Sequence, residues 1–169
     1  MSDFKFNLSD FMCRDAEIEE KERKELEIQK QKHLEQCGIA EKFWKARFEN
    51  FDAYTDGLKN ALQTVKEFVD DLRKGMNRSL WLCGNNGNGK TMLVACVLYE
   101  LGYGSYVKSY EIEDELDEAA SFSSKESKKS VLQKYYTRKL LVIDEVGRFS
   151  SQKELAYLFR ILNERYERG

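Results

Sequence analysis

The stretch that most constrains the fold is GNNGNGKT at residues 84–91, where every residue from 84 to 89 is glycine or asparagine. The apolar run before it, SLWLC at 79–83, predicts a short buried strand of the parallel type. The sequence after it, KTMLVACVLYELG, predicts a helix that ends at Gly102. So many small residues between a strand and a helix either reverse the chain or wrap around a ligand that needs bare backbone.

The loop fits the pattern G-x-x-x-x-G-K-[ST] of a phosphate-binding loop, with the strand and helix that this motif requires on either side. Glycines take backbone angles that other residues resist, so consecutive N–H groups can turn inward around phosphate oxygens. We predict that Lys90 pairs with the β- and γ-phosphates of a nucleoside triphosphate and that the Thr91 hydroxyl holds Mg²⁺. A simple turn would not need the Lys-Thr pair. The predicted nucleotide-binding residues are Gly84, Asn85, Asn86, Gly87, Asn88, Gly89, Lys90, Thr91 and Met92.

The second half of the site is predicted at the end of another apolar run, LLVIDEVG. Adjacent carboxylates after four apolar residues are costly unless they face a cation or solvent. Asp144 is expected to contact the magnesium shell, and Glu145 to polarise an attacking water as general base. The alternative is that both residues only end a strand. The predicted catalytic residues are therefore Lys90, Asp144 and Glu145, the predicted metal residues are Thr91 and Asp144, and the cofactors are ATP and Mg²⁺.

The remaining chain alternates strand and helix patterns, which is typical of an α/β fold with a parallel sheet and crossover helices. Strands are predicted at 105–112 and 139–147, and helices at 60–75, 113–120, 130–139 and 152–169. The apolar face expected on the last helix consists of Leu155, Leu158, Phe159, Ile161 and Leu162.

The N-terminal part is charged and helical. Residues 15–36 are almost all strong helix formers, and Gly38 follows as a stop, but the few apolar positions keep no heptad. We expect this helix either to be exposed to solvent or to bind a partner. The segment GIAEKFWKARFENFDAY at 38–54 is so rich in aromatic residues that we expect it to lie on the core: Phe43, Trp44, Phe48, Phe51 and Tyr54.

The net charge of −2 neither indicates nor excludes nucleic-acid binding, because such binding would have to come from a local basic patch. One candidate patch could track single-stranded DNA, or it could be an ordinary solvated face. No stretch approaches the roughly 18 apolar residues of a membrane span, and no signal peptide begins the chain, so we expect a cytoplasmic protein without membrane contact. The candidate patch comprises Lys125, Lys128, Lys129, Lys134, Arg138 and Lys139 around Tyr135 and Tyr136.

Together, these motifs resemble the DnaC/IstB-like helicase-loader branch of the AAA+ P-loop ATPases. The resemblance covers roughly residues 38–169 and is carried by three segments: GIAEKFWKARFENF, LWLCGNNGNGKTMLVACVLYEL and LLVIDEVGRFSSQKELAYLFRILNERYERG. It implies ATP and Mg²⁺ binding, contacts with single-stranded DNA and a replicative helicase in DNA replication, and a homo-oligomer formed through the ATPase domain. We accordingly divide the chain into an N-terminal helical extension at 1–38 and a partial AAA+ domain at 39–169.

The resemblance also implies an incomplete C-terminus, because relatives continue past the position of Gly169 into another strand, an arginine finger and a helical lid. In the AAA+ sheet, that next strand lies between the strands ending at Cys83 and Asp144. These two strands must then pair directly, receive a strand from another chain, or belong to a fragment. We expect weak or absent ATP turnover, since an arginine finger contributes on the order of 10³-fold to the rate. The alternatives are a nucleotide- or partner-binding remnant without turnover and a transposition helper.

Overall fold

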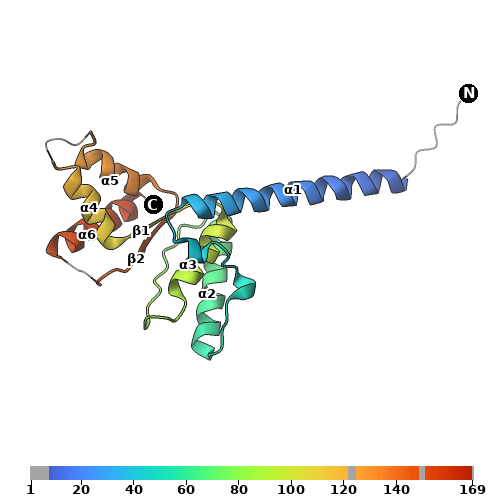
Figure 1. Ribbon diagram of the computed structural model, residues 1–169, viewed down its shortest axis with the longest axis horizontal. Coiled ribbons are helices and arrows are strands. Elements are labelled where there is room, and N and C mark those ends of the chain that lie inside the picture. The colour runs from blue at the N-terminus through green and yellow to red at the C-terminus, as the bar shows by residue number, and fades with distance from the viewer. Residues whose placement is uncertain (1–7, 122–124, 149–150, 169) are drawn as a thin grey trace, which may run out of the picture.

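The computed structural model describes residues 8–121, 125–148 and 151–168 (Figure 1). It is an α/β structure in which six α-helices and two short 3₁₀ helices surround a two-stranded parallel sheet. In chain order, the elements are α1 (Leu8–Gln36), η1 (Glu41–Phe43), η2 (Phe48–Asn50), α2 (Asp56–Arg73), α3 (Lys90–Leu101), β1 (Ser105–Lys108), α4 (Ser109–Glu118), α5 (Lys128–Thr137), β2 (Leu141–Asp144) and α6 (Gln152–Arg168).

The sheet separates two layers of helices. Ser105 of β1 lies opposite Leu141 of β2, and the parallel pairing continues to the end of both strands. Because side chains alternate along a strand, Tyr106 faces the cluster built by the end of α1, α2 and α3, while Val107 faces the cluster built by α4, α5 and α6. Figure 1 shows these two helix groups on opposite sides of β1 and β2. The predicted α/β class with a parallel sheet is confirmed.

The strand predicted at 79–83 does not form. Among the residues that the structure describes, only β1 and β2 make a sheet. Leu80 and Leu82 pack against the first cluster, whereas Trp81 between them is 69% exposed, so the segment keeps a strand's alternation without a partner. Backbone groups form a strand only when a neighbour bonds to them, and no described segment does so here. Direct closure of the two predicted strands is therefore the outcome that the structure contradicts.

The strand predicted at 105–112 is also shorter than expected. It stops at Lys108, where the Glu111 carboxylate accepts a hydrogen bond from the Lys108 N–H at 2.8 Å. A carboxylate that satisfies an N–H group before the first turn favours a helix start, and α4 begins at Ser109. Half of the predicted strand is therefore helix.

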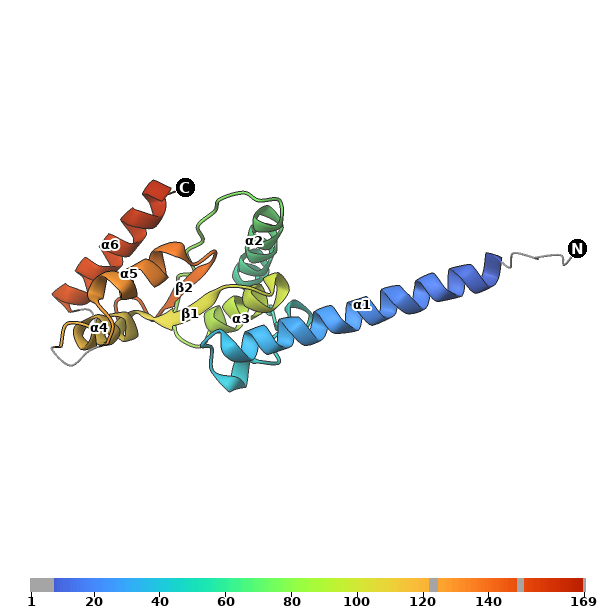
Figure 2. The same cartoon turned by 90° about the horizontal axis from the view of Figure 1, so that it is seen from above.

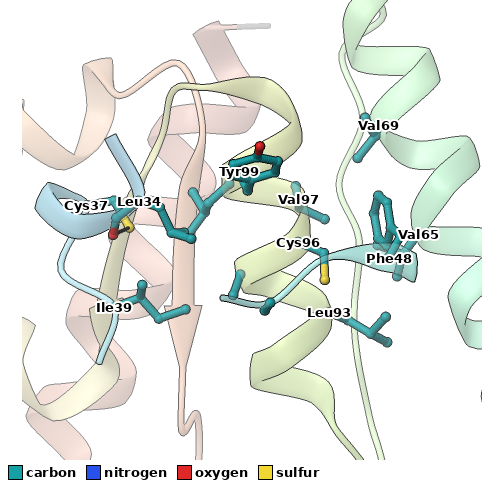
Figure 3. Close-up of a cluster of buried hydrophobic side chains, with 13 residues drawn as sticks. Leu34, Cys37, Ile39, Phe48, Val65, Val69, Leu93, Cys96, Val97 and Tyr99 are labelled. Atoms are coloured by element: carbon teal, nitrogen blue, oxygen red, sulfur yellow. Dashed lines mark hydrogen bonds between the residues drawn. The ribbon is translucent and has the colours of Figure 1, made fainter. Parts of the chain in front are cut away.

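The end of α1 belongs to the packed core, whereas the rest projects away from it in both views (Figures 1 and 2). Leu34 is fully buried and Cys37 nearly so, and both lie in the first cluster (Figure 3). The Tyr106 N–H donates to the Cys37 carbonyl at 2.8 Å, which ties the chain to the free edge of β1. Gly38 has a φ of 99°, and a Cβ there would lie 2.6 Å from the Tyr106 carbonyl oxygen, so glycine is required.

The aromatic segment after α1 lies on the core, as predicted, apart from Tyr54, which is 72% exposed. Phe48 is buried, while Phe43, Trp44 and Phe51 are partly buried against the first cluster. Arg47 fixes this segment across two helices. Its guanidinium lies 3.3 Å from the centre of the Tyr99 ring in α3 and donates to Gln31 in α1 at 2.8 Å.

The predicted apolar face of α6 is only half buried. Leu158 and Ile161 are buried against α4 and α5, but Leu155, Phe159 and Leu162 are 52%, 73% and 48% exposed. These three residues follow each other at helical spacing on the side that no described element covers. The predicted apolar face is therefore present on the helix, but only part of it is covered by described residues. No described helix is both long and apolar enough to cross a membrane.

Candidate nucleotide-binding site

The glycine loop bends sharply before α3. Gly84, Gly87 and Gly89 have φ values of 142°, 85° and 75°, in the left-handed range that favours glycine. Gly89 is also confined by packing, because a Cβ there would lie 2.6 Å from Cε2 of Phe51. The loop is otherwise open, with residues 84–88 exposed. The loop thus depends on glycines, as the motif predicted, and at Gly89 it packs against Phe51 of the aromatic segment.

The N-terminus of α3 faces this loop. The helix begins at Lys90 after Gly89, whose carbonyl accepts from the Leu93 N–H at 2.9 Å. The first N–H groups of a helix have no partner within it, and they carry the positive end of the helix dipole. The amides at Lys90, Thr91 and Met92 therefore form the kind of terminus that binds phosphate.

Lys90 already lies over the loop. Its Nζ donates to the carbonyl oxygens of Gly84 and Asn85, both at 2.9 Å. An ammonium has three donors, so two of them hold the loop closed and one can meet a phosphate oxygen. The remaining predicted loop residues, Asn86 and Asn88, are exposed on the same turn.

One hydrogen bond joins the two predicted halves of the site. Thr91 Oγ1 in α3 donates to Asp144 Oδ2 at the end of β2 at 2.9 Å. The two residues are far apart in sequence, so the fold brings them together by placing α3 against the sheet. A hydroxyl and a carboxylate are oxygen ligands of the kind that Mg²⁺ prefers, and the donor set therefore fits the predicted cofactor.

The Asp144 carboxylate is held in its ionised form. Burial opposes its charge, but the Glu145 N–H, the Tyr106 phenol and the Thr91 hydroxyl all donate to it, and the Lys90 ammonium is nearby. The net result is a pKa of Asp144 below its usual range. The Asp144 side chain is therefore a charged acceptor beside Thr91, directly after the loop.

Glu145 follows in a strained backbone conformation. Its φ is 58°, which is uncommon for a residue other than glycine, and its carbonyl accepts from Ser109 Oγ at 3.2 Å. Its carboxylate pairs with Arg148 at 3.2 Å. The structure thus places the predicted general base beside the site, with its charge already matched by a guanidinium.

Two residues near the loop were missed by sequence reasoning. Tyr106 Oη donates to Asp144 Oδ2 at 2.8 Å, and the Phe51 ring lies against Gly89. Tyr106 sits inside a predicted strand and Phe51 inside the predicted aromatic segment. The sequence gives neither the strand register nor the path of that segment, and both are needed to find these contacts.

The predicted basic stretch is divided between two surfaces. A groove of about 460 Å³ between α5 and α6 is lined by Lys128, Lys129, Tyr136, Arg160 and Arg168, among others. Lys134, Arg138 and Lys139 line a different hollow near the start of the sheet. Tyr135 is only 8% exposed and donates to the Glu115 carboxylate, so its ring is not part of an exposed DNA-binding patch.

Comparison with known proteins identifies the family of the chain. A family model described as "IstB-like ATP binding protein" matches residues 12–169. The chain is also similar to the protein named "Uncharacterized protein YdaV" of Escherichia coli (strain K12), at 27% identity over 150 residues, which is 87% of this chain. It spans 60% of the length of that relative. Because the family match covers nearly the whole sequence, the chain belongs to the family of IstB-like ATP binding proteins.

Proposed function

We propose that the protein is an ATP- and magnesium-dependent accessory of DNA replication, in which nucleotide binding controls contacts with single-stranded DNA and a replicative helicase. Family membership supports ATP binding. The hydrogen bond between Thr91 and Asp144 carries the rest of the nucleotide assignment, because it joins the loop to the acid that a magnesium shell requires. When bound, Mg²⁺ neutralises charge on the phosphates, while this chain's residues hold and orient the nucleotide.

Calorimetry with ATP, with and without MgCl₂, tests the nucleotide site. We expect Lys90→Ala to weaken ATP binding more than about tenfold, because it removes a charge-assisted contact with phosphate. Lys59→Ala is the matched control, since Lys59 is an exposed lysine paired with Asp56 and lies outside the loop. Failure of the folded wild-type protein to take up ATP would refute the proposal.

We propose that turnover of this chain is weak. The carboxylate predicted to polarise water, that of Glu145, is paired with Arg148, so this ion pair must open before the carboxylate can accept a proton from water. A phosphate-release assay with and without single-stranded DNA tests this. Fast hydrolysis that disappears in Lys90→Ala would contradict it.

The groove between α5 and α6 is the surface proposed to contact single-stranded DNA. It gathers Lys128, Lys129, Arg160 and Arg168 around Tyr136, and the Arg168 guanidinium lies 5.3 Å from the centre of the Tyr136 ring. Clustered cations beside an aromatic ring can pair with phosphates and support base stacking.

Filter binding of a labelled single strand across a salt series tests this groove. Affinity should fall steeply with ionic strength, and the charge swap Lys128→Glu with Lys129→Glu should flatten that dependence. The matched control is Lys42→Glu with Lys45→Glu, which changes the same charge in the aromatic segment. Equal effects of both double variants would reject the groove and leave only general charge attraction.

The proposed partner surface for the helicase is the projecting part of α1, where Ile18, Leu26 and Ile28 are 55%, 52% and 54% exposed among charged residues. Co-sedimentation with the replicative helicase or the transposase from the same genome distinguishes the proposed role from that of a transposition helper. The double variant Leu26→Glu with Ile28→Glu should lose helicase binding, and retained binding would exclude this surface.

Sedimentation with and without ATP tests a separate proposal, that the protein forms a homo-oligomer.

A further inference from the structure

A tyrosine outside the sequence motifs contacts the acid of the nucleotide site. Asp144 Oδ2 accepts two hydrogen bonds, from Thr91 Oγ1 at 2.9 Å and from Tyr106 Oη at 2.8 Å, while Oδ1 accepts from the Glu145 N–H at 2.7 Å. An ionised carboxylate offers about four acceptor positions. Three of them are therefore already used, and the open position lies on Oδ1.

The strand register explains how Tyr106 reaches this acid. Tyr106 lies opposite Val142 in the parallel sheet, and Asp144 is two residues further along β2 on the same face. A diagonal neighbour of this kind is within reach of an aromatic side chain. The Tyr106 ring packs against the first core cluster, which fixes the position of its phenol relative to the end of β2.

The consequence of this contact is control over the carboxylate's orientation. Without Tyr106, Oδ2 would keep the Thr91 hydroxyl and Oδ1 the Glu145 N–H as donors, across a terminal torsion that is broad and roughly two-fold. A second donor on Oδ2, from Tyr106 in β1, adds to the Thr91 hydroxyl and the Glu145 N–H and keeps the open position of Oδ1 pointing one way. Orientation of an acid by its own hydrogen-bond partners is a common requirement of metal sites.

We propose that Tyr106 is a positioning residue for magnesium-dependent ATP binding, acting through the carboxylate of Asp144. This inference rests on the proposed function, because it concerns the same nucleotide site. It separates two contributions that the loop motif treats as one. Phosphate binding by residues 84–90 does not involve Tyr106, whereas magnesium binding by Thr91 and Asp144 does.

The test is ATP affinity by calorimetry, measured in excess MgCl₂ and again in EDTA. Tyr106→Phe should weaken affinity about tenfold in MgCl₂ and less than about twofold in EDTA, since only the hydrogen bond to an ionised partner is lost. Tyr135→Phe is the matched control, because Tyr135 also donates to a carboxylate, that of Glu115, but in the second core cluster. It should leave both affinities unchanged.

A double-mutant cycle asks whether Tyr106 acts through Asp144. In an Asp144→Ala background, Tyr106→Phe should have no further effect on the magnesium dependence. Tyr106→Met, which retains much of the packing without a donor, should reproduce the Phe result and guards against a ring-specific folding defect. Circular dichroism confirms that each variant is folded.

The outcomes are distinguishable. If wild-type protein binds ATP and Tyr106→Phe weakens binding equally in MgCl₂ and EDTA, or not at all, the positioning role is wrong and the proposed function stands. If the Tyr106→Phe effect persists at full size without the Asp144 carboxylate, the role is likewise refuted. If folded wild-type protein binds no ATP, the proposed function and this inference fail together.

Discussion

Gly89→Ala should be one of the most damaging single-methyl changes in the protein, for two separable reasons. Gly89 has a φ of 75°, and placing an L side chain in the left-handed region costs about 1–2 kcal/mol. The added Cβ would also lie 2.6 Å from Cε2 and 3.1 Å from Cζ of Phe51. Since carbon atoms prefer a separation of about 3.5–4.0 Å, the ring must move by about 1 Å, and overpacking of this kind costs about 1–3 kcal/mol.

The total expected loss of unfolding free energy is about 2–4 kcal/mol, after allowing about 0.4–1 kcal/mol for the lower entropy of the unfolded alanine variant. The clash can be isolated by adding Phe51→Ala. That change alone should cost about 2 kcal/mol, less than the full value for a buried phenylalanine because the ring is only partly buried. In the double variant the overlap is gone, so its loss should be smaller than the sum of the single losses by about 1–3 kcal/mol.

Urea denaturation followed by circular dichroism measures these differences. Gly75→Ala is the matched control, because Gly75 also has a positive φ, 79°, but a Cβ there meets nothing within 4 Å. It should show the backbone cost alone and no coupling to Phe51→Ala. If the Gly89→Ala and Phe51→Ala losses are additive to within about 0.5 kcal/mol, the aromatic segment does not support the phosphate loop and the reasoning fails.

Three further changes test other parts of the structure. Glu154→Gln should raise the melting temperature, since this glutamate is 1% exposed and neither carboxylate oxygen has a partner in the described structure. Arg165→Met should lower the unfolding free energy by about 2–4 kcal/mol in urea, because one guanidinium nitrogen donates to three carbonyls at the end of α5, including those of Tyr135 and Arg138. Stability measured against pH should fall below about pH 5 in wild-type protein more than in Asp144→Asn, since a carboxyl group with a lowered pKa stabilises the fold above its unfolded pKa and loses that effect as pH falls through the folded one.

The phosphate loop was predictable because its information is local. Gly84, Gly87 and Gly89 permit the positive φ values of the loop, and Lys90 and Thr91 follow at the start of α3. Their roles in nucleotide binding remain predictions, but their placement required no knowledge of distant residues. The parallel sheet was predictable for a similar reason, since alternating strand and helix patterns leave few other arrangements.

The errors occurred where structure depends on a partner. The run at 79–83 has the composition of a buried strand. A β-strand forms only when its backbone bonds to a neighbouring strand, and no described segment pairs with this run. The exposed residues of α6 show the same limit: Phe159 has the periodicity of a core residue but lies 73% exposed, because periodicity identifies an apolar face without naming what covers it. Tyr106 was missed for the complementary reason, since its partner depends on strand register.

The site lies where the two core clusters meet, and this location links nucleotide binding to the whole described body. Thr91 belongs to a helix of the first cluster, whereas Asp144 ends the strand whose other face, at Ile143, packs on the second. Phe51 connects the loop to the segment that Arg47 fastens to α1. A ligand that tightens the Thr91 and Asp144 contact therefore opposes separation of the two clusters, since the sheet that joins them has only two short strands. Nucleotide bound between Thr91 and Asp144 would thus add a link between the two clusters to the one that the two-stranded sheet provides.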